Sequence, residues 1–302
     1  MKLLTFSTTQ HSTPRIGVLM DDGTLLDVGA AAQHSRLRLA FDPSDMISLV
    51  ASGKRGLDQL RLLADAQAHG LPQAQEVRIH APIPRPRKNV FCVGWNYLEH
   101  FEEGERIRQS GQELPKHPVF FTKAPTAVNG PFGDIYCDPA LSDKFDWEVE
   151  LGVVIGEGGK SINEQAAMAH IVGYTVVNDI SVRDVQRAHG GQWFKGKSFD
   201  GTCPIGPYLV TADAVDPNAL QVSCRVNGVT KQNSNTRFMY FKIPRLIAEL
   251  SRGMTVEAGD IISTGTPEGV GFARNPPEFL KPGDIVETEI AGLGVMRNRM
   301  VA

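Results

Sequence analysis

The sequence has few cysteines and no pattern that would use them as ligands or crosslinks. Its four cysteines are widely separated, and none belongs to a Cys-x-x-Cys pair or to a cysteine–histidine cluster with zinc spacing. With 302 residues the chain is long enough to bury a substantial core without disulfides. Reduced, buried thiols are therefore expected at all four positions, Cys92, Cys137, Cys203 and Cys224.

Long apolar runs and an excess of positive charge are also missing. No stretch approaches the ~20 apolar residues that span a bilayer, and the first ten residues contain no apolar segment typical of a signal peptide. Lys and Arg total 31 against 34 Asp and Glu, a formal net charge of −3, and no basic block could follow a phosphate backbone. These absences argue against membrane and nucleic-acid partners, and we expect a cytoplasmic protein.

The chain divides at a proline-rich connector. Residues 81–88 contain three prolines in five positions, which excludes a helix and favours an extended segment. We therefore predict a small N-terminal domain over residues 1–81 and a larger domain over residues 82–302. In the first, strands at 15–20 and 24–28 flank an Asp-Gly turn, and helices are expected at 44–51 and 57–68, with Gly70 as the stop.

The larger domain is predicted to be mainly β. Short β-branched runs, separated by glycine-rich turns, occur at residues 89–93, 118–122, 151–155, 173–177 and 221–226. Segments 161–164 and 181–184 resemble capping boxes that start short helices, and a helix over 244–251 is expected to end at Gly253. Residues 104–117 are polar without a clear period, as in a mobile loop. The predicted fold class is α+β, mainly β.

Two acidic residues lie at the start of a predicted strand whose later residues are all apolar. Glu148 and Glu150 are two apart, so they point to the same face of the strand. Two close carboxylates resist burial unless a cation, a proton or an arginine compensates them, and hard divalent ions prefer such oxygen ligands. Asp179 is a third acid, at the end of another apolar run. The ordinary alternatives are a solvated strand face and a turn or helix cap.

Five further residues have side chains suited to catalysis. His100 and Glu103 share one face of a short helical turn, where the carboxylate would fix the imidazole tautomer and raise its basicity. Lys195 and Lys197 lie among aromatic and small residues, where a lysine can bind a carboxylate or an oxyanion, and Lys123 is a similar case. A surface His/Glu pair and solvated loop charges remain alternatives. Residues 263–271 offer hydroxyls and backbone N–H groups for an anion, without a nucleotide-binding fingerprint.

Together these segments resemble the fumarylacetoacetate hydrolase family from about residue 88 to the C-terminus. Five blocks agree in order, which is far more specific than any single one. They are Gly-x-Asn-Tyr-x-x-His-x-x-Glu at 94–103, Glu-x-Glu-Leu at 148–151, Asp179 with Arg-Asp-Val-Gln at 183–186, Lys-Ser-Phe at 197–199, and Thr-Gly-Thr-Pro-x-Gly-Val-Gly at 264–271.

The resemblance implies a mixed β-roll or β-sandwich catalytic domain, usually in a homodimer, with a bound Mg²⁺ or Mn²⁺; Ca²⁺ would be a non-native occupant. By motif, the metal ligands are Glu148, Glu150 and Asp179, and the catalytic residues are His100, Glu103 and Lys197. The resemblance likewise implies substrate contacts for Gln186, Thr266, Lys123 and Arg183. Many relatives have arginine where this chain has Trp95, which leaves the distal part of the substrate open.

Family substrates are mostly 2-oxo and 1,3-diketo acids, whose 2-oxo carboxylate chelates a divalent ion. The reaction predicted from the sequence is hydrolysis of an acylpyruvate-like C–C bond by a water that the His100–Glu103 pair activates. One alternative is decarboxylation or isomerisation of a related oxo acid. The other is a catalytically silent metabolite-binding protein.

Overall fold

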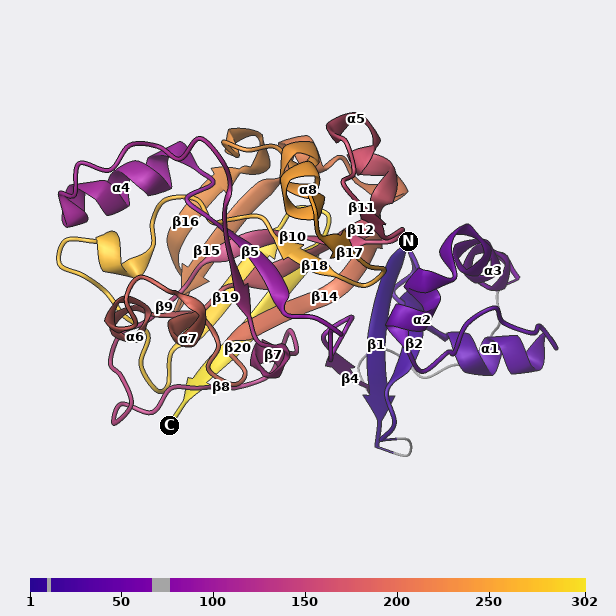
Figure 1. The fold of residues 1–302 in the computed structure, drawn as a ribbon. Helices are drawn as coiled ribbons and strands as arrows, with labels where there is room; N and C mark the ends of the chain where they lie inside the picture. The colour runs from indigo at the N-terminus through magenta and orange to yellow at the C-terminus, as the bar shows by residue number, and fades with distance from the viewer. Residues whose placement is uncertain (10–11, 67–76) are drawn as a thin grey trace.

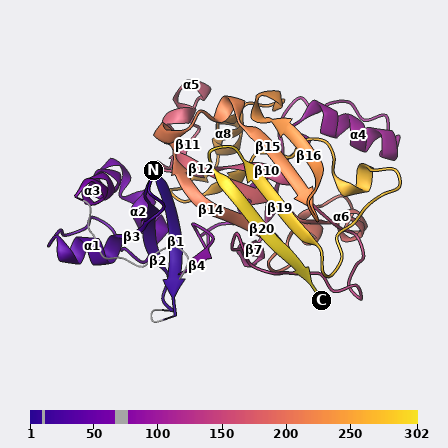
Figure 2. The same cartoon turned by 180° about the vertical axis from the view of Figure 1, so that it is seen from behind.

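Strands rich in β-branched residues form two facing sheets in the computed structural model, which describes residues 1–9, 12–66 and 77–302 (Figures 1 and 2). Eleven strands of these residues belong to the larger sheet. Its main path runs β3 (Leu25–Asp27), β2 (Arg15–Leu19), β1 (Lys2–Thr8), β14 (Cys203–Thr211), β12 (Ile171–Asn178), β10 (Val149–Ile155), β18 (Ile261–Ser263), β5 (Val90–Gly94), β6 (Val119–Lys123). Off this path, β4 (Val77–His80) pairs with β1 and β7 (Val128–Asn129) pairs with β14.

The second sheet covers one face of the first, as the view from behind shows (Figure 2). Its strand order is β16 (Val229–Asn235), β15 (Gln221–Val226), β19 (Ile285–Ile290), β20 (Gly294–Val301), β8 (Ile135–Tyr136). Val153 and Val176 of the larger sheet belong to the same buried apolar cluster as Val222 and Met296 of the smaller one. The main core therefore lies between the sheets, and the mainly β, α+β fold predicted from the sequence is confirmed.

The N-terminal segment continues the larger sheet at one end (Figure 1). β1 pairs with β14 through Lys2 opposite Val210 and Leu3 opposite Leu209. The hairpin of β2 and β3 is as predicted. Leu3 shares a buried cluster with residues of β5 and β14. The division into domains at residues 81–82 stays a prediction, as does the homodimer.

Eight α-helices of the described residues border these sheets. They are α1 (Val28–His34), α2 (Met46–Ala51), α3 (Gly53–Asp65), α4 (Leu98–Arg108), α5 (Glu164–Ala167), α6 (Arg183–Ala188), α7 (Phe194–Lys197) and α8 (Ile243–Ser251). The remaining short strands pair as β11 (Gly159–Lys160) with β17 (Thr255–Val256) and β9 (Phe145–Asp146) with β13 (Ser181–Val182). The predicted stop at Gly70 lies outside the described residues. No described helix is long and apolar enough to cross a membrane.

Four local predictions differ from the structure. Helix α3 begins at Gly53, four residues before the predicted start at residue 57. The cap of α5 is Asn163, whose side chain accepts from the Ala166 N–H, so Ser161 does not form a capping box. Ser181 does not cap α6 because its hydroxyl donates to the Asp179 carbonyl at 3.0 Å. The loop expected from residue 104 begins only after Arg108, where α4 ends in a left-handed Gln109. By contrast, all four cysteines are free and buried as expected.

Candidate active site

The three candidate metal ligands lie close together because β12 ends beside the start of its neighbour β10 in the larger sheet. β10 and β12 pair antiparallel with Val149 opposite Asn178. Glu148, just before β10, and Asp179, just after β12, therefore lie at the same end of the two strands. Glu150 is two residues after Glu148, so its side chain lies on the same face of the strand. One oxygen from each carboxylate lies within 4.8 Å of the others, and all three side chains are buried.

Three buried cations neutralise part of this acidic cluster. Lys197 Nζ lies 2.6 Å from both Glu148 Oε2 and Asp179 Oδ2. Arg183 Nη2 contacts Glu148 Oε1 at 2.7 Å, and its Nε donates to Asp146 Oδ2 at 2.8 Å. The third cation is Lys123, described below. Burial would raise the pKa of Glu148, but Lys197 and Arg183 outweigh it and hold the pKa well below its usual range.

Glu150 is the acid left without a cation among the described residues. Its Oε2 accepts from Ser263 Oγ at 2.5 Å and from the Gly265 N–H at 2.9 Å, both neutral donors. Burial, then the charges of Asp179 and Glu148, raise the pKa of Glu150 to about 8. The network holds four buried acids, with Asp146 included, and three buried cations. A hard divalent cation fits this donor set, because it supplies the missing charge and prefers carboxylate oxygens.

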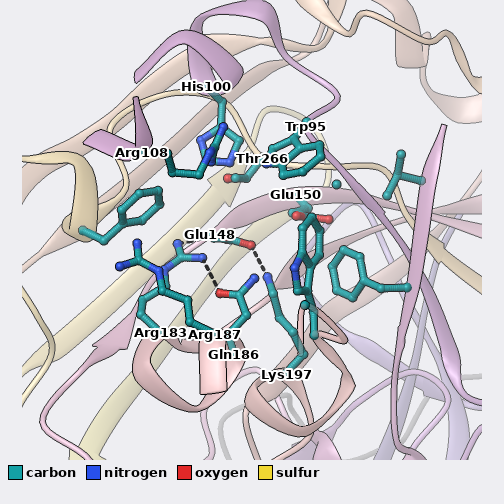
Figure 3. A pocket seen from close by; sticks show the side chains of 16 residues that line it. Trp95, His100, Arg108, Glu148, Glu150, Arg183, Gln186, Arg187, Lys197 and Thr266 are labelled. Atoms are coloured by element: carbon teal, nitrogen blue, oxygen red, sulfur yellow. Dashed lines mark hydrogen bonds and ion pairs between the residues drawn. The ribbon is translucent and has the colours of Figure 1, made fainter. Parts of the chain in front are cut away.

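His100 and Glu103 form a buried pair one turn apart on α4. His100 Nδ1 lies 2.8 Å from Glu103 Oε1, and Glu103 Oε2 accepts from the Gly269 N–H at 2.9 Å. An ionised carboxylate only accepts hydrogen bonds, so the imidazole proton belongs on Nδ1. Nε2 then carries a lone pair, and His100 is one of the residues that line the pocket beside Glu148 and Glu150 (Figure 3).

The pocket between α4, α6 and α7 has a volume of about 240 Å³. Drug-sized ligands occupy roughly 300–1,000 Å³, so this pocket suits a smaller molecule. Predicted residues Gln186, Thr266, Arg183 and Lys197 line it together with His100 and the two glutamates. Residues from all five sequence motifs thus line one cavity.

Lys123 and the backbone of residues 263–271 have partners within the protein, and their predicted contact with a substrate stays a prediction. Lys123 is fully buried and does not line this pocket; its Nζ lies 2.8 Å from Asp179 Oδ1 and donates to the Ile180 carbonyl at 2.9 Å. Lys123 therefore forms an ion pair with Asp179 without lining the pocket. The backbone N–H groups of Gly265 and Gly269 bind the protein's own Glu150 and Glu103, instead of a substrate anion.

Sequence reasoning missed two arginines and an aromatic wall. Arg108 and Arg187 line the pocket, as do Trp95 and Trp193, whose ring centroids are 5.0 Å apart. Trp95 has a φ of 55°, in the left-handed region that non-glycine residues seldom adopt, and such strain gathers at functional sites. A signal existed for Arg108: it follows Gly104 by one helical turn, and a glycine inside a helix often makes room for a neighbouring group.

Comparison with known proteins places this geometry in a family. The family model described as Fumarylacetoacetate (FAA) hydrolase C-terminal matches residues 89–301. The chain is 40% identical over 293 residues to "Oxaloacetate tautomerase YisK" of Bacillus subtilis (strain 168), covering 94% of this chain and 95% of that protein.

Two solved structures extend the comparison. Fumarylacetoacetate hydrolase (EaFAH) from Exiguobacterium antarcticum superposes with a TM-score of 0.83 at 35% identity, covering 100% of this chain and 99% of that one. Maleylpyruvate hydrolase from Sphingobium sp. SYK-6, in complex with manganese(II) and pyruvate, has a TM-score of 0.76 at 28% identity, covering 100% and 99% of the two chains. The chain belongs to the fumarylacetoacetate hydrolase family.

Proposed function

We propose that this chain catalyses the metal-dependent keto–enol tautomerisation of a short 2-oxo acid, with oxaloacetate as the substrate. The observation that supports this proposal is a small pocket in which a cluster of three carboxylates lies near the imidazole of His100, whose Nε2 is available to take a proton. The relative named as an oxaloacetate tautomerase supports this reaction over the C–C hydrolysis predicted from the sequence. That prediction's stated alternative, isomerisation, is therefore the better supported one.

Glu148, Glu150 and Asp179 would hold the divalent ion, Mg²⁺ or Mn²⁺, which when bound supplies positive charge to a 2-oxo carboxylate and acidifies the neighbouring C–H. Lys197 adds a fixed positive charge. Burial would lower the pKa of Lys197, but Asp179 and Glu148 raise it well above its usual range, so this lysine stays an ammonium. It stabilises an oxyanion and does not act as a base.

His100 is the proposed base and acid. Its Nε2 takes a proton from C3 of the oxo acid, and the electron pair of that C–H bond becomes the C2–C3 double bond while negative charge moves to the C2 oxygen. The same Nε2 then returns the proton to that oxygen, which gives the enol with no atom gained or lost. Glu103, fixed by Gly269, holds the imidazole in the tautomer that this transfer needs and stabilises its transient charge.

Acylpyruvate hydrolysis is the second candidate. A structural neighbour is a maleylpyruvate hydrolase solved with manganese and pyruvate. The His100–Glu103 pair would then deprotonate a water that attacks the remote carbonyl. The two candidates differ in whether the proton removed comes from carbon or from water.

Product analysis separates these functions. With Mg²⁺ or Mn²⁺, tautomerisation predicts faster loss of the ultraviolet absorbance of the enol form of oxaloacetate and faster deuterium exchange at C3, with unchanged substrate mass apart from that exchange. Pyruvate-like and carboxylate fragments from a diketo acid would instead support hydrolysis, and CO₂ release would support decarboxylation. Binding of oxo acids without any turnover would favour the metabolite-binding alternative.

A further inference from the structure

Two of the three arginines that line the pocket make no ion pair with the carboxylate cluster in the described residues. Arg183 is committed to Asp146 and Glu148 by the ion pairs described above. Arg108 and Arg187 make no contact of this kind with the carboxylate cluster in the described residues. Figure 3 shows Arg108 on the His100 side of Glu148 and Arg187 beside Arg183 and Gln186.

Arg108 is folded back along its own helix towards the pocket. Its guanidinium packs against Gly104, where an added Cβ would lie 2.7 Å from Nη1, and stacks 5.2 Å from the Trp95 ring centroid. Nε and Nη2 are buried and have no hydrogen-bond partner among the described residues. The nearest carboxylate oxygen, Glu105 Oε2, lies 3.5 Å from Nε. Two donors of Arg108 are thus left for a ligand.

Arg187 lies at the pocket rim on α6. Its guanidinium stacks on Phe272 at 5.4 Å from the ring centroid, as Arg183 does at 4.6 Å. No ion pair of Arg187 occurs in the described part of the chain. Partial burial, then the charges of Arg183 and Arg108, lower its pKa. Both arginines line the same pocket, so an anion bound between them would relieve the repulsion of their like charges.

We propose that Arg108 and Arg187 bind the second carboxylate of a dicarboxylic 2-oxo acid and so select dicarboxylates over monocarboxylates. The planar guanidinium presents paired donors that match a carboxylate. Trp95, on which Arg108 stacks, and Trp193 also line the pocket and carry no charge. This inference rests on the proposed function, because the 2-oxo carboxylate is assigned to the metal end of the pocket.

The kinetic test compares oxaloacetate with pyruvate, which has the same 2-oxo carboxylate but no second one. The measured quantity is the ratio of kcat/KM for C3 deuterium exchange in the two substrates. Arg108→Gln and Arg187→Gln should each lower this ratio by at least ~10-fold, mainly through KM for oxaloacetate, since a hydrogen bond to a charged group contributes about 1.5–3 kcal/mol. Arg106→Gln is the matched control on α4, because Arg106 does not line this pocket, and it should leave the ratio unchanged.

Gly104→Ala tests the position of Arg108 without removing it. The atom that a new Cβ would meet is the end of a flexible side chain, and alanine favours a helix, so the fold should be retained. The guanidinium must shift, and KM for oxaloacetate should rise more than KM for pyruvate. Adding Arg108→Gln to Gly104→Ala should give no further loss than Arg108→Gln alone.

Equilibrium binding keeps this inference separate from the proposed reaction. Malate and lactate differ only in the second carboxylate, and neither needs turnover to bind. In titration calorimetry of the Mg²⁺-loaded enzyme, wild type should prefer malate, and Arg108→Gln and Arg187→Gln should reduce that preference. An unchanged malate preference in both variants overturns the inference. Wild type that prefers malate yet fails to tautomerise oxaloacetate overturns the proposed function and leaves the arginine assignment standing.

Discussion

At the scale of single residues, the chemistry depends on which nitrogen of His100 carries the proton. Glu103 accepts a hydrogen bond from Nδ1–H of His100 and another from the Gly269 N–H. Nε2 of His100 is therefore the ring nitrogen that can accept a proton. We predict that His100→Ala loses tautomerase turnover by about 10²–10⁴-fold, the usual contribution of a general acid–base group. Metal affinity should stay unchanged, because His100 is not among the clustered ligands.

The control for this variant is His117→Ala, which removes an exposed imidazole. Enol-form absorbance measures turnover, and calorimetric titration with Mn²⁺ measures metal binding. Turnover at the wild-type rate in His100→Ala would show that another group removes the C3 proton.

The relative placement of Glu148 and Glu150 could be predicted from one short sequence motif. The Glu-x-Glu spacing alone fixes a common face for Glu148 and Glu150. Arg187 had no such signal, because it belongs to a pocket only through the packing of α6 against α7. Gly196 permits that packing: a Cβ there would lie 2.4 Å from the Gln186 backbone nitrogen. The close approach of these two helices depends on tertiary packing, which a local sequence pattern does not show.

At the scale of elements, Asn96 connects the end of β5 to two loops of the site. Its side-chain amide donates to the Thr264 and Phe241 carbonyls at 2.7 and 3.0 Å, and its oxygen accepts from the Phe241 N–H at 2.7 Å. It is fully buried. We predict that Asn96→Ala costs about 2–4 kcal/mol of unfolding free energy, because three backbone groups lose their partner.

Asn233→Ala is the comparison for Asn96→Ala, since Asn233 makes one exposed side-chain bond, to Gln221. Denaturant unfolding should show little change for Asn233→Ala. Equal stability losses in the two variants would contradict the role assigned to Asn96.

Element boundaries were predicted well for strands and less well for helix ends. The run at 221–226 coincides with β15, since alternating burial imposes a clear period of two. Helix α4 extends to Arg108, whereas its last buried residue is Gly104, so the buried face ends before the helix does. The capping boxes failed at Ser161 and Ser181 because the Ser-x-x-Glu/Asp pattern does not say which residue leaves the helix. Ser161 instead accepts from the Gly253 N–H at 3.4 Å, and Ser181 belongs to β13, which pairs with β9.

At the scale of the whole molecule, the acidic cluster links folding, metal binding and pH. The folded-state pKa of Glu150 is about 8 against an ordinary value of 4.5, so the metal-free folded protein binds a proton that the unfolded chain has released between these pH values. A raised folded-state pKa gives stability that is full below pH 4.5 and is lost as pH rises towards 8. A divalent ion takes the place of that proton as the charge partner of Glu150.

We therefore predict that metal-free wild type loses unfolding free energy at roughly 1 kcal/mol per pH unit from about pH 5 to 8, relative to Glu150→Gln. Glutamine keeps an oxygen that can accept from Ser263 and Gly265 but has no charge to neutralise, so this variant should fold and lack that pH term. Excess Mg²⁺ should raise the Tm of wild type increasingly towards pH 8 and change the Tm of Glu150→Gln little. A ligand that binds only the folded state stabilises it by an amount that grows with the logarithm of its concentration divided by Kd. Thermal unfolding of both proteins with chelator and with Mg²⁺ at several pH values measures all four curves. Parallel curves for the two metal-free proteins, or an equal Mg²⁺ shift in both, would contradict the assignment of Glu150 as a metal ligand that is protonated in the metal-free protein.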